Sequence, residues 1–271
     1  MTTDQTAPAA IAISELRTDL TGQVIAPGDA DYDRARTVVA GGIDRRPAVI
    51  VKVADVDDVV GVVRLARETG LELAVRSGGH SGAGHSVTEG GIVLDLSDLK
   101  GIDIDVDGRT AWAETGLTAA DVTRALAPHG LAIGFGDTGS VGIGGITLGG
   151  GVGYLVRRFG LTIDDVLAAE VVTADGEVVM ASEESEPDLF WAIRGGESNF
   201  GVATRFRLRL HEISEIVGGM LVLPATPEVI TGFLEAAQAA PDELSTIANV
   251  TLAPPMPFIP EEAHGNPIVM G

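Results

Sequence analysis

Two glycine-rich segments hold the residues of this chain that are best suited to chemistry. The first is Arg76-Ser77-Gly78-Gly79-His80-Ser81, which directly follows the apolar run 71–75, and the second extends from Gly139 to Gly153 and contains eight glycines. Glycine lets backbone amides approach a ligand closely, and successive amides in such loops form a concave site for an anion such as a diphosphate. His80 adds a nucleophilic imidazole nitrogen beside that site. Together the two segments indicate a bound dinucleotide.

The common nucleotide and hydrolase motifs do not fit these segments. In a G-x-G-x-x-G pattern starting at Gly142, Thr147 stands where the third glycine belongs, and no lysine follows the glycines as a P-loop requires. The hydrolase pattern G-x-S-x-G fails around Ser81, because alanine replaces its last glycine. His80 and His85 have no carboxylate at the spacing of zinc enzymes, so we expect no metal site.

Composition narrows the class of protein. The 271 residues are 45% hydrophobic and 4% aromatic, which predicts an aliphatic core in one large domain or two modest ones. The absence of cysteine excludes disulfides, a thiolate nucleophile and cysteine-ligated metals. A net charge of −21 disfavours nucleic acids and anionic membrane surfaces as partners. Neither a signal-peptide pattern nor an apolar run of about 18 residues is present, so a soluble, cytoplasmic protein is expected.

Apolar runs and turn signals predict alternating strands and helices up to about residue 214. Asp55 is the expected N-cap and Gly70 the expected end of a helix between two strands, which places the loop 76–81 at the carboxyl end of a strand, where ligands of α/β sheets bind. Asp107-Gly108 and Asp175-Gly176 predict hairpin turns. Strands are predicted at 48–53, 71–75, 91–96, 101–106, 109–114, 167–173, 177–181 and 202–210, with further helices at 118–127 and 187–194.

The sequence changes character after Glu215. An apolar strand at 217–223, a helix at 227–240 and a strand at 244–252 are predicted there. The last residues, 268–271, are typical of the start of another apolar element, which fits either a truncated chain or a frayed tail. The expected organisation is an N-terminal segment at 1–39, a ligand-binding domain at 40–214 and part of a second domain at 215–271.

The order of the motifs resembles one flavoprotein superfamily. The segments 75–80, 91–96 and 141–151, followed by 160–162, 170–176, 189–196 and 199–202, are similar to the PCMH-type (vanillyl-alcohol-oxidase-like) FAD-binding proteins, and within them to the berberine-bridge-enzyme-like oxidoreductases. The resemblance covers roughly residues 40 to 212. It implies an α+β fold, with a two-subdomain FAD-binding domain followed by an incomplete α+β substrate domain.

The resemblance also implies roles for individual residues. The loop from Arg76 to Ser81 would hold the FAD diphosphate, and His80 would bond covalently to the 8α carbon of the flavin. Many relatives add a second link from a cysteine at the position of Thr138, so a chain without cysteine implies a single attachment. Glu197-Ser198 replaces the more usual glycines, which leaves the geometry of that loop open. The other implied cofactor-binding residues are Ser77, Gly78, Gly79, Gly139, Ser140, Val141, Gly144, Gly145, Gly149, Gly151, Val171, Gly201 and Val202.

The function implied is that of an FAD-dependent, oxidase-like oxidoreductase acting on a small molecule. A C–H bond at a carbon bearing a hydroxyl or an amine would transfer hydride to flavin N5, and molecular oxygen would reoxidise the flavin. The sequence identifies no catalytic base; Tyr154, in a helix-like stretch, is a poor candidate. Two alternatives stay open: a truncated FAD-binding module without independent turnover, and a nucleotide-binding module without flavin in which His80 has no role.

Overall fold

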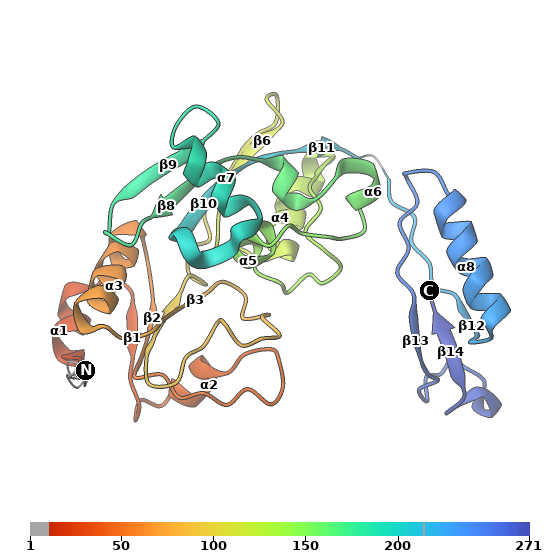
Figure 1. The fold of residues 1–271 in the computed structure, drawn as a ribbon, viewed down its shortest axis with the longest axis horizontal. Coiled ribbons are helices and arrows are strands. Elements are labelled where there is room, and N and C mark those ends of the chain that lie inside the picture. The colour runs from red at the N-terminus through yellow and green to blue at the C-terminus, as the bar shows by residue number, and fades with distance from the viewer. Residues whose placement is uncertain (1–10, 214) are drawn as a thin grey trace, which may run out of the picture.

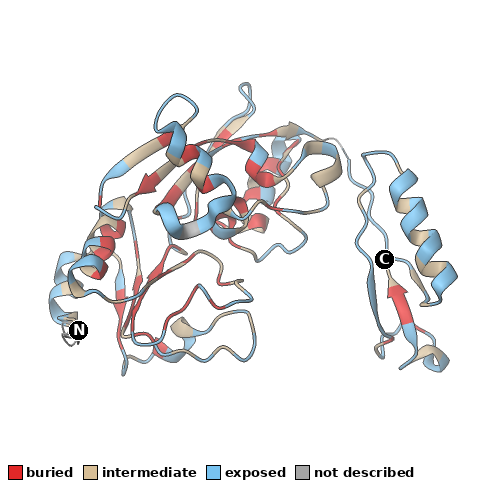
Figure 2. Cartoon of the chain, in the orientation of Figure 1, coloured by how far each residue is buried: buried red, intermediate tan, exposed pale blue. Residues whose placement is uncertain are grey.

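The computed structural model describes residues 11–213 and 215–271, except for the side chain of Ser198. Residues 11–213 build two larger sheets and one two-stranded sheet, and residues 215–271 form a smaller unit beside them (Figure 1). This mixture of helices and mainly short strands confirms the expected α+β class. Buried residues concentrate in the two larger sheets and the helices that cover them (Figure 2).

The first sheet has the strand order β1-β2-β4-β3. Strands β2 and β3 both pair in parallel with β4, and β1 pairs antiparallel with β2. The expected strand–helix–strand unit is therefore present, with β4 inserted between its two strands. Its elements are α1 (Ile13–Asp19), β1 (Gln23–Ile25), α2 (Tyr32–Arg36), β2 (Val49–Lys52), α3 (Val56–Thr69), β3 (Leu73–Arg76) and β4 (Ile92–Asp95).

Helix α3 begins and ends where the sequence predicts. The Asp55 carboxylate accepts the amide of Asp58 at 3.0 Å, and Gly70 takes the left-handed conformation, with φ 67°, at the C-terminal end. Val59, Val62 and other residues at helical spacing are buried against the sheet. Capping and hydrophobic periodicity thus determine this helix together.

The N-terminal residues belong to the same packing unit as the first sheet. The buried Asp58 carboxylate accepts the amides of Thr21 and Gly22 at 2.8 Å each, which fixes the approach to β1. Strand β1 extends the sheet, and Val24 lies in the core beneath α3. The described N-terminal residues therefore pack with the first sheet.

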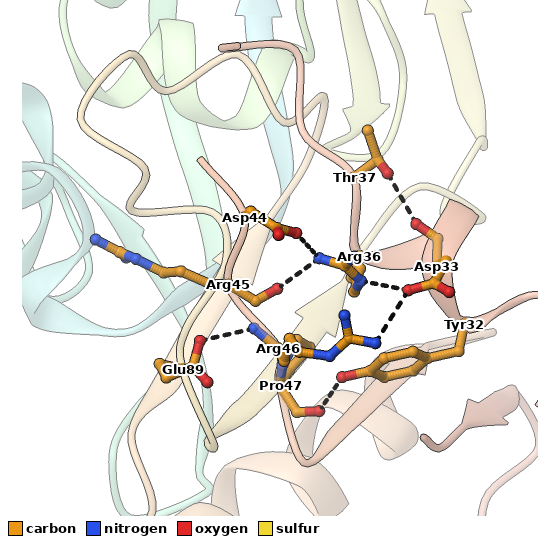
Figure 3. A network of polar contacts seen from close by, with 9 residues as sticks. All are labelled: Tyr32, Asp33, Arg36, Thr37, Asp44, Arg45, Arg46, Pro47 and Glu89. Carbon is orange, nitrogen blue, oxygen red and sulfur yellow. Dashed lines mark hydrogen bonds and ion pairs between the residues drawn. The ribbon is translucent and has the colours of Figure 1, made fainter. Parts of the chain in front are cut away.

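A polar network attaches α2 to the segment that leads into β2 (Figure 3). The Tyr32 hydroxyl donates to the Pro47 carbonyl at 2.6 Å. Arg36 donates to the carboxylates of Asp33 and Asp44 and to the Arg45 carbonyl, the last at 3.3 Å. Since Arg36 is largely buried, with 14% of its side chain exposed, these bonds hold the segment 44–47 in one position.

The second sheet is antiparallel throughout, with the order β5-β6-β10-β8-β9. Phe206 and Leu208 on β10 are fully buried beneath it. Strands β7 and β11 pair with each other in a separate two-stranded sheet. The elements of this part of the chain are β5 (Ile102–Asp105), β6 (Thr110–Glu114), α4 (Ala119–Leu126), η1 (Ala127–His129), β7 (Leu131–Ala132), α5 (Ile143–Leu148), α6 (Val156–Phe159), η2 (Thr162–Asp165), β8 (Val166–Val172), β9 (Val178–Ser182), α7 (Pro187–Gly196), η3 (Glu197–Phe200), β10 (Val202–Arg209) and β11 (His211–Glu212).

Both predicted hairpins are present, but neither has a two-residue loop. The loop of the second contains residues 173–177, between the paired Val172 and Val178. The first hairpin also has a different turn from the one expected. The pairing ends at Asp105 opposite Thr110, so its loop contains four residues rather than the two expected, Asp107-Gly108. The Asp105 carboxylate accepts the Gly108 amide at 2.8 Å, and Arg109 adopts the left-handed conformation, with φ 49°. The Asp105 carboxylate thus provides a local acceptor for the loop backbone, and this contact accompanies the longer loop.

Residues 215–271 form a three-stranded sheet of order β12-β14-β13 with one helix on it. The helix is confirmed, with the Thr226 hydroxyl as its cap, whereas the predicted strands 217–223 and 244–252 are shorter than expected. The apolar end of the chain forms the central strand of this sheet, and its buried residues stand out in Figure 2. The elements are β12 (Val222–Pro224), α8 (Pro227–Ala239), β13 (Asn249–Leu252), η4 (Glu261–Ala263) and β14 (Pro267–Met270).

One arginine links this unit to the rest of the described chain. Arg157 on α6 donates to the carbonyls of Ala237, Ala240 and Leu244 at 3.1, 2.7 and 2.8 Å, and it lies 3.5 Å from the Asp242 carboxylate. These carbonyls are at and just beyond the C-terminal end of α8, where backbone acceptors lack helical partners and a positive charge is favourable.

We expect Arg157→Ala to loosen this link. Loss of three hydrogen bonds should let the last turn of α8 fray, so that its amides exchange with solvent about tenfold faster. Arg158→Ala is the matched control, because the Arg158 guanidinium instead lies 5.0 Å from the Phe159 ring centroid. Hydrogen exchange measured by mass spectrometry compares the two, and equal exchange in both would contradict the assignment.

A buried carboxylate lies at the base of the segment that leads to residues 215–271. Asp165 contacts His211 Nε2 at 2.8 Å, and the Phe159 ring stacks on the His211 imidazole at 4.2 Å. Burial raises the pKa of the Asp165 carboxyl, although His211 and Arg209 lower it. The folded protein therefore binds this proton more tightly than the unfolded chain does.

Because the pKa of Asp165 is raised in the folded protein, the stability that this group contributes falls as the pH rises. The stability that Asp165 contributes is fully present below its ordinary pKa of 3.8 and is lost as the pH rises through the raised value. Relative to Asp165→Asn, the wild-type protein should thus lose unfolding free energy as the pH increases above about 4. Urea unfolding of both proteins across pH 4 to 7 measures this difference, and a flat or rising difference would count against the raised pKa.

Candidate functional site

Both glycine-rich segments line one cavity of about 1100 Å³ between the two large sheets. Loop 77–82 forms part of its wall, and α5 with the residues just before it forms another part. Helix α3 and the residues 173–175 line it as well. Among the residues expected to bind a cofactor, those that line the cavity are Ser77, Gly78, Gly79, His80, Ser81, Val141, Gly144, Gly145, Gly201 and Val202.

The two segments meet backbone to backbone. A Cβ atom on Gly78 would overlap the amide of Gly142, and a Cβ on Gly142 would overlap the Gly78 amide and the Ser77 hydroxyl. That hydroxyl donates to the Thr115 carbonyl at 2.5 Å and accepts the Gly144 amide at 3.3 Å. Glycine at 78 and 142 is therefore a requirement of close packing, and Ser77 fastens the contact.

The loop after β3 presents a row of free amides to the cavity. Within the described chain, none of the amides of Gly78, Gly79, His80, Ser81 and Gly82 donates a hydrogen bond, and all five residues line the cavity. Gly79 is buried and has a φ of 69°, which favours glycine. The other four residues are partly buried or exposed, and successive free amides that line a cavity suit an anionic ligand with several acceptor oxygens.

His80 is held by the second segment. Its Nε2 lies 3.1 Å from the Ser140 hydroxyl, whereas Nδ1 makes no hydrogen bond with the described residues. If Nε2 carries the ring proton and donates it to Ser140, the Nδ1 lone pair is available for chemistry. Ser140 does not line the cavity itself, so its contribution is to orient the imidazole.

Arg76 has a different position from the one its motif suggests. Its guanidinium donates to the Asp95 carboxylate at 2.8 Å, and each side chain is only 7% exposed. It does not line the cavity; its stem lies 3.5 Å from where a Cβ of Gly79 would be. The ion pair joins the ends of β3 and β4 below the loop, so Arg76 supports the loop rather than facing a ligand.

The remaining expected residues lie away from the cavity wall. Thr138 and Gly139 are exposed beside Ser140, and the Thr138 hydroxyl donates to Asp137 at 3.0 Å. Gly149 and Gly151 follow α5, and a Cβ on Gly151 would overlap the Thr162 side chain. Val171 is buried in the core of the second sheet. None of these residues is among those that line the cavity.

Several cavity residues were not expected from the sequence. Arg67 on α3 pairs with Asp175 after β8 at 2.8 Å, and both line the cavity. Glu197 also lines it, with a φ of 57° that is uncommon for a residue with a side chain, and its carboxylate lies over Gly149. These contacts join segments more than 100 residues apart or depend on one loop conformation, so no local pattern signals them. The others include Val63, Ala66, Ser86, His85, Thr173 and Asn199.

The described ranges, 11–213 and 215–271, contain no group of three or more histidine, cysteine or acidic residues that could hold a metal ion. None of their helices is both long and apolar enough to cross a membrane.

Comparison with known proteins agrees with this geometry. Residues 47–182 match the FAD binding domain family, so the chain belongs to this family of FAD-binding domains. The expectation of FAD as the cofactor is thereby supported over a nucleotide-binding module without flavin.

The similar proteins include oxidases and berberine-bridge-enzyme-like (BBE-like) proteins, which confirms the resemblance seen in the motifs. The chain is 37% identical over 235 residues to (R)-6-hydroxynicotine oxidase of Paenarthrobacter nicotinovorans, covering 86% of this chain and 51% of that one. The crystal structure of 6-hydroxy-D-nicotine oxidase from Arthrobacter nicotinovorans superposes with a TM-score of 0.82 and 34% identity, over 93% of this chain and 55% of the other. Physcomitrella patens BBE-like 1 gives a TM-score of 0.81 and 26% identity, over 96% and 56%. The chain therefore spans about half the length of these relatives.

A pair of glycine substitutions tests the close approach of the two glycine segments. Gly142→Ala should destabilise the fold by about 2 kcal/mol, because its Cβ overlaps backbone atoms. Gly145→Ala should leave stability unchanged or slightly higher, because no atom lies within 4 Å of its Cβ and alanine favours helix α5. Urea midpoints measure both, and equal destabilisation would contradict the close approach.

Proposed function

We propose that the cavity binds FAD, with the diphosphate on the amides of residues 78–82 and the flavin attached to His80. The row of free amides carries this proposal, because it matches an anion with many acceptor oxygens. The cavity volume of about 1100 Å³ exceeds that of most small-molecule sites, as a dinucleotide requires. The close contact of Gly78 with Gly142 holds the two glycine segments together at this cavity.

The attachment is proposed to be single and to use Nδ1 of His80. Ser140 contacts Nε2, which leaves Nδ1 as the nitrogen with an available lone pair. The matching cysteine position of related flavoproteins is occupied here by Thr138, and the chain contains no cysteine. A hydroxyl does not replace a thiolate as a nucleophile at neutral pH, so no second link is expected.

We propose an oxidase-like oxidoreductase activity for the protein. FAD, when bound, supplies the redox chemistry: it accepts hydride at N5 from a substrate C–H bond at a carbon bearing a hydroxyl or an amine, and molecular oxygen reoxidises it. The names of the oxidase relatives support this class of reaction. The chain's own contribution is to bind and orient the cofactor through the two glycine segments.

The alternative is an FAD-binding module without independent turnover. All residues that line the cavity fall between 63 and 203, so the described part of 215–271 contributes none. Anaerobic addition of sugars, alcohols and amines tests this, because a substrate should bleach the yellow flavin. A yellow protein that no compound bleaches would favour the alternative.

The covalent bond is tested with two histidines of the same cavity. Wild-type protein should retain its yellow colour after acid precipitation, and its intact mass should include FAD. His80→Ala should lose this retention while still binding FAD reversibly, whereas His85→Ala should keep the bond, because both histidines line the cavity but only His80 contacts Ser140. Retention of flavin by His80→Ala, or a wild-type mass of the bare polypeptide after incubation with excess FAD, would refute the attachment.

A further inference from the structure

Ser86 has an unpaired hydroxyl in the cavity wall. The residue is only 6% exposed, and its Oγ is buried without a hydrogen-bond partner among the described residues. It lines the same cavity as His80 and the free amides of residues 78–82. A buried hydroxyl without a partner lowers the stability of a fold, so a partner supplied by a ligand is the simplest reason to retain it.

The position of Ser86 is fixed from both sides. Arg45 Nη1 donates to the carbonyl of Gly84 at 2.9 Å and to that of Val87 at 2.8 Å, so one guanidinium holds the backbone on either side of Ser86. The Arg45 carbonyl in turn accepts from Arg36, within the network of Figure 3. Gly84, with φ 78°, would place a Cβ against the Ile43 side chain at 3.0 Å. The segment around Ser86 is therefore held in place before a ligand binds.

A second buried hydroxyl shows that an absent partner alone does not define a ligand contact. Thr147 on α5 is fully buried, and its Oγ1 also lacks a partner among the described residues, but Thr147 does not line the cavity. What distinguishes Ser86 is the combination of an unpaired hydroxyl, a fixed backbone and a position in the cavity wall. Thr147 thereby provides a matched control.

We propose that the Ser86 hydroxyl donates a hydrogen bond to an oxygen of the bound FAD. This rests on the proposed function, because it takes FAD as the ligand of the cavity. FAD presents acceptor oxygens along its diphosphate, sugar chains and flavin ring. The bond removes the cost of the unpaired group only in the loaded protein, so Ser86 favours cofactor binding without stabilising the empty fold.

The test uses the His80→Ala protein, in which FAD binding is reversible and its dissociation constant can be measured by flavin fluorescence. Adding Ser86→Ala should weaken FAD binding about tenfold, the effect of one hydrogen bond to a polar or charged acceptor. The urea midpoint of the FAD-free protein should stay equal or rise, because an unpaired buried polar atom is removed. Thr147→Val should raise that midpoint with no change in the dissociation constant.

Each outcome is decisive. An unchanged dissociation constant in Ser86→Ala would overturn the proposal, as would a lower urea midpoint with unchanged binding, which would show a purely structural hydroxyl. Ser86→Cys keeps nearly the same side-chain volume but replaces the hydroxyl with a much weaker hydrogen-bond donor. If Ser86→Ala disturbs folding, Ser86→Cys should still weaken FAD binding about as much as alanine does. Failure of both the wild-type and the His80→Ala protein to bind FAD would instead refute the proposed function.

Discussion

The contact between Gly78 and Gly142 is the constraint on which the rest of the site depends. It brings a loop of the first sheet and the start of α5 together with no side chain between them. Because the backbones touch, the amides of residues 78–82 and the residues from Val141 onward face the same cavity. A single added methyl group would separate the two walls, and the cavity would lose the geometry that suits a dinucleotide.

Charged side chains in this structure act mainly on the backbone. The buried pair of Arg76 and Asp95 joins two strand ends below the loop of His80, and Arg45 holds the carbonyls beside Ser86. Asp58 fixes the approach to β1 in the same way. Side chains thus determine the shape of loops whose amides and hydroxyls remain free for a ligand. This division of roles explains why Arg76 follows the pattern of a binding motif without lining the cavity.

Local chemistry made much of the fold predictable. Asp55 and Gly70 mark the ends of α3, Thr118 caps α4, and the hairpin at Asp175-Gly176 follows from its turn residues. The loop 76–81 and the glycines of α5 were recognisable for the same reason. The part of the cavity wall formed by Arg67 and Asp175 was not predictable from the sequence. These two residues are more than 100 positions apart in the chain, and only the packing of the folded protein brings them together. The strands after residue 215 are shorter than predicted, because apolar composition alone does not show how many residues pair.

The cavity and the C-terminal unit occupy separate parts of the described chain. The cavity is lined entirely from residues 63 to 203. Arg157 on α6, four residues after the glycine segment that ends at Gly153, contacts the C-terminal end of α8. None of the described residues 215–271 lines the cavity, so this contact lies outside the cavity wall.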